Sequence, residues 1–264
     1  MKYLGGKTLI VPWVREHVLS RVSEPLSCVY VEPFVGSATV WTAMAPLFAS
    51  AAGYDGHPDL VLLHRALRDG WRPPRVTRET YDEYRWAEPS ALRGYLGFFC
   101  GFGGIWYRCF AGDLPRWDER ELENMWVTAR LTAALRRCPP VEHRDYRDVV
   151  VGGRDVVYAD PPYSGTESYG GVSFDSYRFW AIAAGWVRSG ALVVVSESRA
   201  PGNWVCVAER TRIGLLAYRS NGGGRFSPVR HERLFVHESQ AMASERHAHA
   251  VAMSEGRRAW PAIE

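Results

Sequence analysis

The feature that most constrains this chain is the run from Asp155 to Tyr163, which reads Asp-Val-Val-Tyr-Ala-Asp-Pro-Pro-Tyr. A short apolar run that stops at a carboxylate and two prolines predicts a buried strand ending at Asp160. In open α/β sheets, ligands bind at the carboxyl ends of the strands. The run therefore predicts an α/β fold with a site at Asp160, Pro161, Pro162 and Tyr163.

These four residues have the chemistry to bind a planar amino group. Neither proline has an N–H, and each favours extended geometry in the residue before it, so backbone carbonyls there are available to a ligand. A carboxylate beside a fixed carbonyl offers two acceptors and no donor, which suits the exocyclic amine of adenine. Tyr163 adds a stacking face. An ordinary loop whose tyrosine covers the edge of the core explains the same residues about equally well.

A glycine-containing turn nearer the N-terminus predicts a binding loop for a nucleoside. The strand pattern at 28–31 runs into Glu32-Pro33-Phe34-Val35-Gly36-Ser37-Ala38 and then into an apolar helix to about Ala51. A strand, a glycine turn and a helix form half of a nucleotide-binding unit. The next strand pattern, 53–55, ends in Asp55, at the offset where such sites place a carboxylate on ribose hydroxyls.

Three stretches, in this order, carry a resemblance to a known family. Lys2-Tyr3-Leu4-Gly5-Gly6-Lys7 resembles the opening K-[WY]-x-G-G-K of the D12 class of DNA adenine methyltransferases, which includes the Dam proteins. The loop at 32–38 is similar to the E-P-F-x-G-x-G cofactor loop of that family, and 160–163 to its [DN]-P-P-[YF] motif. Two departures stand out: Ala38 replaces the last loop glycine, and His57 replaces the asparagine of D-x-N-P-D-L.

The resemblance implies a Rossmann-like methyltransferase fold, with a mostly parallel sheet, helices on both faces and one antiparallel strand near its end. It implies transfer of a methyl group from S-adenosylmethionine to N6 of an adenine flipped out of DNA, expected to be double-stranded. Asp160 and its neighbours 161–163 would be catalytic. The cofactor-binding set would be Tyr3, Leu4, Lys7, Phe34, Gly36, Asp55, Asp145 and Tyr146.

The segment from Trp71 to Cys138 differs from its surroundings, because it is rich in aromatic residues and arginines and poor in strand patterns. We interpret 71–138 as a helical insertion for target recognition, with 1–70 and 139–238 as the catalytic domain and 239–264 as a peripheral tail. A helix is predicted over 119–137, with Leu122, Met125, Trp126 and Ala129 on one face.

Within the insertion, the glycine-aromatic stretch 97–108 resembles strings in phage-like members of the family. Aromatic rings between arginines can hold flipped nucleotides, although a helical subdomain that packs its own aromatics explains any single ring better. Arg108, and Arg225 at the tip of a glycine-rich hairpin, are the predicted DNA contacts. That hairpin is expected to join strands at 213–218 and 232–237.

Composition limits the function classes. The net charge is +3, and only two of the 32 basic residues are lysines, which permits nucleic-acid binding without requiring it. Five scattered cysteines predict free thiols and no metal site. We expect a soluble, cytoplasmic protein with no signal or membrane segment.

Other classes remain open. Protein-glutamine and RNA adenine methyltransferases share the Asp160 motif, but the stretch 2–7 is not expected in them. A catalytically silent DNA-binding relative would keep the insertion and lose the cofactor. A nicotinamide oxidoreductase would explain the glycine turn and Asp55, but it would leave Pro161, Pro162 and Tyr163 unexplained.

Overall fold

The computed structural model describes residues 7–114, 117–162, 174–213, 218–219, 225–226 and 229–241. Three predicted site residues, Tyr3, Leu4 and Tyr163, lie outside these ranges, as does most of the predicted tail. The side chain of Arg225 is also outside the description.

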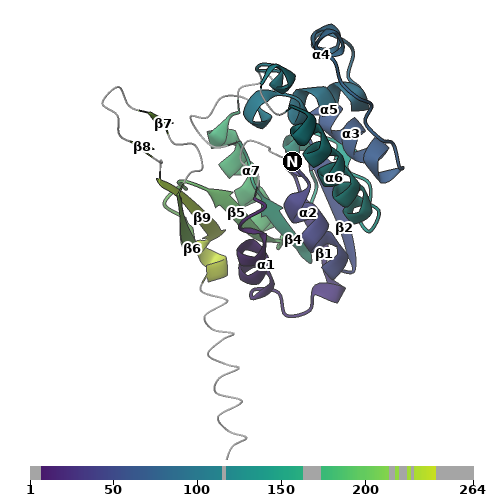
Figure 1. Ribbon diagram of the computed structural model, residues 1–264. Helices are drawn as coiled ribbons and strands as arrows, with labels where there is room; N and C mark the ends of the chain where they lie inside the picture. The colour runs from purple at the N-terminus through teal and green to yellow at the C-terminus, as the bar shows by residue number, and fades with distance from the viewer. Residues whose placement is uncertain are drawn as a thin grey trace, which may run out of the picture.

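A seven-stranded sheet forms the centre of the molecule, in the order β3-β2-β1-β4-β5-β9-β6 (Figure 1). Its strands in chain order are β1 Val29–Glu32, β2 Ser50–Asp55, β3 Glu142–His143, β4 Asp155–Ala159, β5 Leu192–Glu197, β6 Trp204–Ile213 and β9 Val229–His237. The five neighbouring strands β3, β2, β1, β4 and β5 are parallel to one another. Strand β9 runs antiparallel to both β5 and β6. The fold is therefore the Rossmann-like α/β fold predicted from the sequence, with the order of strands reversing between β1 and β4.

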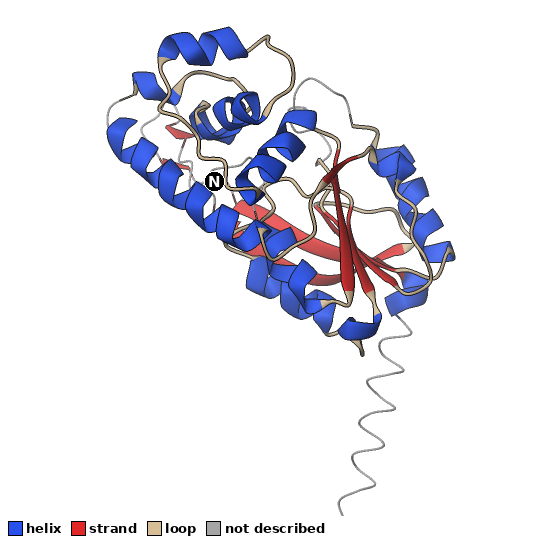
Figure 2. Cartoon of the chain, turned by 90° about the vertical axis from the view of Figure 1, so that its right-hand side faces the viewer, coloured by secondary structure: helices blue, strands red, loops and turns tan. Residues whose placement is uncertain are grey.

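Both faces of the sheet are covered because its central strands are apolar on both sides. In β1, Tyr30 packs into one hydrophobic cluster and Val31 into the other. In β4, Tyr158 and Val157 alternate between the same two clusters. Helices α1 Val11–Leu19, α2 Thr39–Met44 and α3 Pro58–Arg68 cover the first face, and α7 Ser176–Arg188 covers the second (Figure 2).

The segment between α3 and β3 is helical, with α4 Arg78–Tyr84, α5 Ala91–Phe99 and α6 Trp117–Leu135. Helices α4 and α5 begin with side-chain caps from Thr77 and Ser90. The segment packs on α3 through a hydrophobic cluster that continues into the sheet. Short 3₁₀ turns complete the chain: η1 Pro25–Ser27, η2 Ala45–Leu47, η3 Phe102–Gly104, η4 Ala111–Asp113 and η5 Tyr146–Asp148.

Two predicted elements were wrong in extent. The helix expected to continue to about Ala51 ends at Met44, because Pro46 enforces a 3₁₀ turn and β2 already begins at Ser50. The last strand pairs with β6, Trp204–Ile213. Of the partner stretch predicted at 213–218, Ile213 lies in β6, and 214–217 are outside the described residues. β6 was missed because its central residues are polar and it lies at the edge of the sheet. The two-residue strands β7 Tyr218–Arg219 and β8 Arg225–Phe226 pair antiparallel, and the glycine-rich stretch between them, 220–224, is outside the described residues.

Among the described residues, no helix is long and apolar enough to cross a bilayer. The same part of the chain contains no cluster of three or more His, Cys, Asp or Glu side chains arranged to bind a metal ion.

Candidate active site

The carboxyl edge of the sheet gathers acidic side chains. Glu32 ends β1, Asp55 ends β2, Asp160 follows β4 and Glu197 ends β5. The strands are parallel and in close register, so these ends meet at one edge of the sheet. Strands β1 and β4 lie side by side where the strand order reverses, which is where sheets of this kind bind ligands.

Lys7 ties the N-terminal segment to this edge. Its Nζ lies 3.1 Å from Asp160 Oδ1 and 3.0 Å from Glu232 Oε2, and the side chain is almost completely buried. The carbonyl of Lys7 accepts the amides of Ile10 and Val11 at the start of α1, which fixes the backbone of Lys7. The cation therefore binds two carboxylates of the protein itself, whereas the sequence left its anionic partner open.

The charge states of this pair are shifted by burial. Burial raises the pKa of Asp160 to about 6, and the ammonium of Lys7 opposes that rise. Burial alone would lower the pKa of Lys7, but Asp160, followed by Tyr158 and Glu232, raises it above its ordinary value. Lys7 is thus a permanent cation, and it favours the ionised form of Asp160 at neutral pH.

The glycine turn after β1 is bound to the end of β2. Oδ2 of Asp55 accepts the amide of Gly36 at 2.8 Å, and Oδ1 accepts the amide of His57 at 2.8 Å. Burial raises the pKa of Asp55, and these two amides oppose the rise. Each oxygen retains one lone pair for a ligand hydroxyl. Asp55 therefore already shapes the loop in which the sequence predicts a cofactor site.

Ala38, which stands where the family has glycine, adopts a left-handed backbone conformation with φ +56° and is fully buried. A Cβ makes this conformation costly, by about 1–2 kcal/mol. The loop thus keeps the geometry that a glycine would favour and does so under strain.

Two predicted cofactor residues meet in an aromatic cluster. The ring of Phe34 lies 5.2 Å from that of Tyr146, and both contact Phe174 and Phe179. The neighbouring Asp145 is half exposed and receives a bidentate contact from Arg147, with distances of 2.8 and 2.6 Å. That hydrogen-bonded arginine lowers the pKa of Asp145.

Three acidic residues at this site were missed from the sequence: Glu32, Glu197 and Glu232. All are buried, and Glu32 accepts the hydroxyl of Tyr30 at 2.7 Å. Burial raises the pKa of Glu32 well above its ordinary value. Glu32 and Glu197 were detectable, because each ends an apolar strand run as Asp55 does. Glu232 lies in the polar run 230–233 of β9, where nothing distinguishes it from a solvent-facing residue.

The segment 71–138 uses most of its aromatic residues for packing. Phe98, Phe99 and Tyr107 are buried, and Trp106 lies 4.7 Å from Phe98 between ring centroids. Arg93 stacks on Trp106 and forms an ion pair with buried Asp59 at 3.1 Å. The packing explanation therefore holds for these rings, while Phe102 and Arg108 are exposed.

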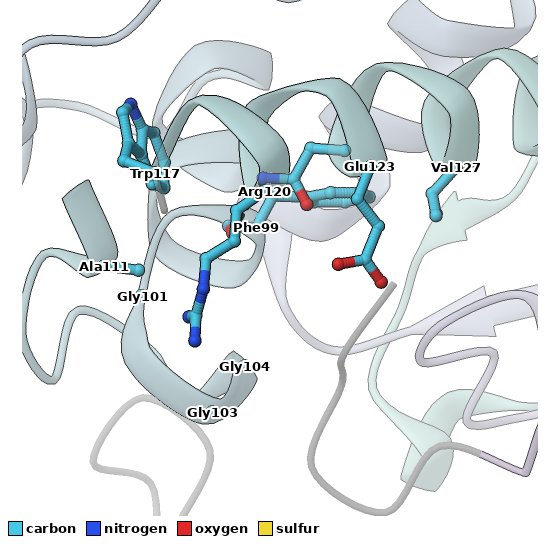
Figure 3. Close-up of a pocket in the computed structure, with 10 residues that line it drawn as sticks. Phe99, Gly101, Gly103, Gly104, Ala111, Trp117, Arg120, Glu123 and Val127 are labelled. Carbon is cyan, nitrogen blue, oxygen red and sulfur yellow. Dashed lines mark hydrogen bonds between the residues drawn. The ribbon is translucent and has the colours of Figure 1, made fainter. Parts of the chain in front are cut away.

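A small pocket lies where the glycine-aromatic stretch meets α6. It is lined by Phe99, Gly101, Gly103, Gly104, Ala111, Trp117, Arg120, Glu123, Asn124 and Val127. Figure 3 shows Arg120 and Glu123 of α6 pointing toward the side of the pocket formed by Gly103 and Gly104.

Residues 3–92 match the family model described as D12 class N6 adenine-specific DNA methyltransferase. The match confirms the predicted resemblance over the N-terminal segment, the glycine turn and Asp55, and it supports a methyltransferase. The matched region ends before Asp160. No curated protein matches the chain. Two solved structures of the rRNA methyltransferase aviRa from Streptomyces viridochromogenes, at 1.5 and 2.4 Å, are similar to it, each at 14% identity. Each alignment covers 89% of this chain and 86% of the other, with TM-scores of 0.43 and 0.41.

Proposed function

We propose that this protein is an S-adenosylmethionine-dependent DNA methyltransferase that modifies N6 of adenine. The observation that carries the proposal is the 3.1 Å contact between Lys7 and Asp160. Lys7 lies in the segment that matches the D12 family, and Asp160 lies in the Asp-Pro-Pro stretch outside it. Two independent indications of the same chemistry thus meet at one edge of the sheet.

The residues at this edge fit the proposed cofactor, which supplies an electrophilic methyl group on a positively charged sulfonium. Among the described residues of this edge, the carboxyl groups of Asp55, Asp160, Glu197 and Glu232 gather around the ammonium of Lys7, whereas burial raises the pKa of Glu32 and favours its neutral form. The edge therefore favours a cationic ligand. Phe34 and Tyr146 offer aromatic surface for the adenine of the cofactor, and Asp55 offers acceptors for its ribose hydroxyls. Tyr3 and Leu4 belong to this proposed set through the family motif.

Asp160 acts on the amine of the target base. The lone pair of that nitrogen is delocalised into the adenine ring, so an acceptor that favours a tetrahedral amine raises its nucleophilicity. The Asp160 carboxylate and the carbonyl of Pro161 are the proposed acceptors, and Lys7 keeps Asp160 ionised. The positive charge that develops on nitrogen is stabilised by the same carboxylate.

The target adenine must leave the duplex to reach this edge, at a cost of a few kcal/mol. Pro162 limits the backbone freedom of the motif, and Tyr163 is the proposed stacking partner of the flipped base. Arg108 of the insertion and Arg225 of the small hairpin are the proposed phosphate contacts.

The proposal is tested by incubating the protein with S-adenosylmethionine carrying a labelled methyl group and with DNA from a host that lacks adenine methylation. Nucleoside analysis by mass spectrometry should show labelled N6-methyldeoxyadenosine. Label in RNA or in protein glutamine, with none in DNA, would assign the fold to another methyltransferase class. Cofactor binding by calorimetry separates the remaining alternatives, since a silent relative binds no S-adenosylmethionine and an oxidoreductase binds a nicotinamide dinucleotide.

A further inference from the structure

Helix α6 presents its apolar face to the outside of the molecule. Leu122, Met125 and Trp126 are 57%, 59% and 73% exposed, and Ala129 and Ala133 continue the same stripe. Figures 1 and 2 agree that α6 runs along the outside, over α3.

The inward face of α6 consists of different residues. Thr128 and Leu135 are buried there, and Val127 and Leu131 pack against the core. Asn124 donates to the carbonyl of Phe99 at 3.2 Å, which fixes the rotation of the helix. The face predicted to be apolar is therefore not the one that holds α6 to the protein, and within the described part of the chain it is exposed.

We propose that this stripe, defined as Leu122, Met125, Trp126, Ala129 and Ala133, binds the same stripe of a second copy of the chain, with the two helices antiparallel. Positions 122, 126, 129 and 133 are spaced by four, three and four residues, the spacing of a two-helix seam. A two-fold interface requires a surface that complements itself.

The sizes of the side chains make the stripe complementary to a second copy of itself. When the helix is reversed about its middle, Leu122 faces Ala133 of the second copy and Trp126 faces Ala129 of the second copy. Each large side chain thus lies opposite a small one, which allows the helices to approach closely at both ends of the seam.

The charges beside the stripe also complement those of a second, antiparallel copy. The N-terminal half of α6 carries four carboxylates, Asp118, Glu119, Glu121 and Glu123. Two arginines oppose them: Arg120 of the helix, and Arg75, which lies 3.4 Å from both Asp118 and Glu121. The C-terminal half and the residues just beyond it carry Arg130, Arg136 and Arg137. Glu119 lies beside the start of the stripe and Arg137 beside its end, so the antiparallel arrangement brings them together twice. The same carboxylates repel phosphate, which favours a protein partner over DNA on this face.

One pair of 19-residue helices is a small interface. Stable specific complexes bury about 1,200–2,000 Å² in total, and a single helix pair lies at or below the low end of that range. We therefore expect a reversible dimer with a micromolar dissociation constant.

Sedimentation velocity of the full chain over a range of concentrations tests the proposal. Trp126→Glu should weaken the dimer at least about tenfold, which corresponds to about 1.4 kcal/mol. Because Trp126 is exposed, this variant should fold normally, and circular dichroism checks that it does. Arg199→Glu, at a site away from α6, is the control and should dimerise as the wild type does.

A charge exchange identifies the partner as a second copy. Glu119→Arg and Arg137→Glu should each weaken the dimer about threefold or more, and the double variant should restore it, because only a two-fold antiparallel seam pairs these residues with each other. A wild-type protein that stays monomeric at high micromolar concentration overturns the proposal. So does a dimer that Trp126→Glu leaves intact, or a DNA affinity that falls in Trp126→Glu while the wild type remains monomeric. These outcomes do not depend on methyl transfer, which is measured separately.

Discussion

Lys7 Nζ lies 3.1 Å from Asp160 Oδ1 and joins the N-terminal segment to the end of β4. The same nitrogen lies 3.0 Å from Glu232 of β9. Three distant parts of the chain are thus joined by one buried cation. This arrangement sets both the position and the charge of Asp160.

Removal of the cation should shift the pH dependence of activity. Burial raises the pKa of Asp160 to about 6 in the free protein, so kcat/KM of the wild type should fall as pH drops through 6 and the carboxylate becomes protonated. In Lys7→Met the opposing charge is lost, the pKa of Asp160 rises further, and this limb should move to higher pH. Lys7→Arg, which keeps the charge, is the control.

Loss of the buried cation should also cost stability, by about 3–5 kcal/mol, because two carboxylates are left without it. A Lys7→Met enzyme with an unshifted acid limb would remove Lys7 from the control of Asp160.

Asp55→Ala should weaken the binding of S-adenosylmethionine by about 1–3 kcal/mol, measured by calorimetry. The substitution removes the acceptor of the Gly36 and His57 amides as well as the proposed ribose contact. Asp69→Ala, at an exposed site after α3, is the control. Equal affinity in both variants would exclude Asp55 from the cofactor site.

Ala38→Gly should stabilise the protein by roughly 0.5–1 kcal/mol in urea denaturation. Relief of the left-handed strain contributes about 1–2 kcal/mol, and the greater freedom of glycine in the unfolded chain offsets part of it. Ala43→Gly, inside α2, should instead destabilise by up to about 1 kcal/mol. If Ala38→Gly and Ala43→Gly lowered the unfolding free energy equally, Ala38 would not be strained.

His64 should make the fold sensitive to acid. It is buried in α3, neither ring nitrogen has a hydrogen-bond partner among the described residues, and burial lowers its pKa to about 4. The unfolded chain therefore binds more protons between pH 4 and 6.5, and stability falls as pH drops through that window. The shift corresponds to roughly 3 kcal/mol.

His64→Phe should flatten the dependence of unfolding free energy on pH in that window. His57, whose pKa burial also lowers to about 4, contributes a remaining slope. A slope in His64→Phe equal to that of the wild type would contradict the assignment.

Much of the sheet was predictable because its strands end in readable signals. The apolar runs before Glu32 and Asp160 predicted β1 and β4. The limits had physical causes. Strand β6 lies at the edge of the sheet, and its polar residues do not show the period-2 pattern that separates a strand from a loop in the sequence. The ion pair of Lys7 with Glu232 joins residues that are 225 positions apart, which no local pattern reveals.

The orientation of α6 shows the same limit. The helix was predicted, but its most apolar face is exposed, because α3 and α5 meet the face that carries Asn124, Thr128 and Leu131. Periodicity locates an apolar face without saying whether it meets the core or a partner.

The central claim, that Asp160 promotes methyl transfer to the amine of adenine, is tested most directly by the rate of Asp160→Asn. Its side chain keeps an oxygen acceptor but has no charge to stabilise the positive nitrogen. With saturating S-adenosylmethionine and DNA, we expect single-turnover transfer to fall at least about 100-fold, the scale for loss of one preorganised electrostatic group. Calorimetry should show cofactor affinity retained, and Asp69→Asn should transfer at the wild-type rate. A rate for Asp160→Asn equal to that of the wild type, or no transfer by the wild type to any DNA containing adenine, would contradict the account.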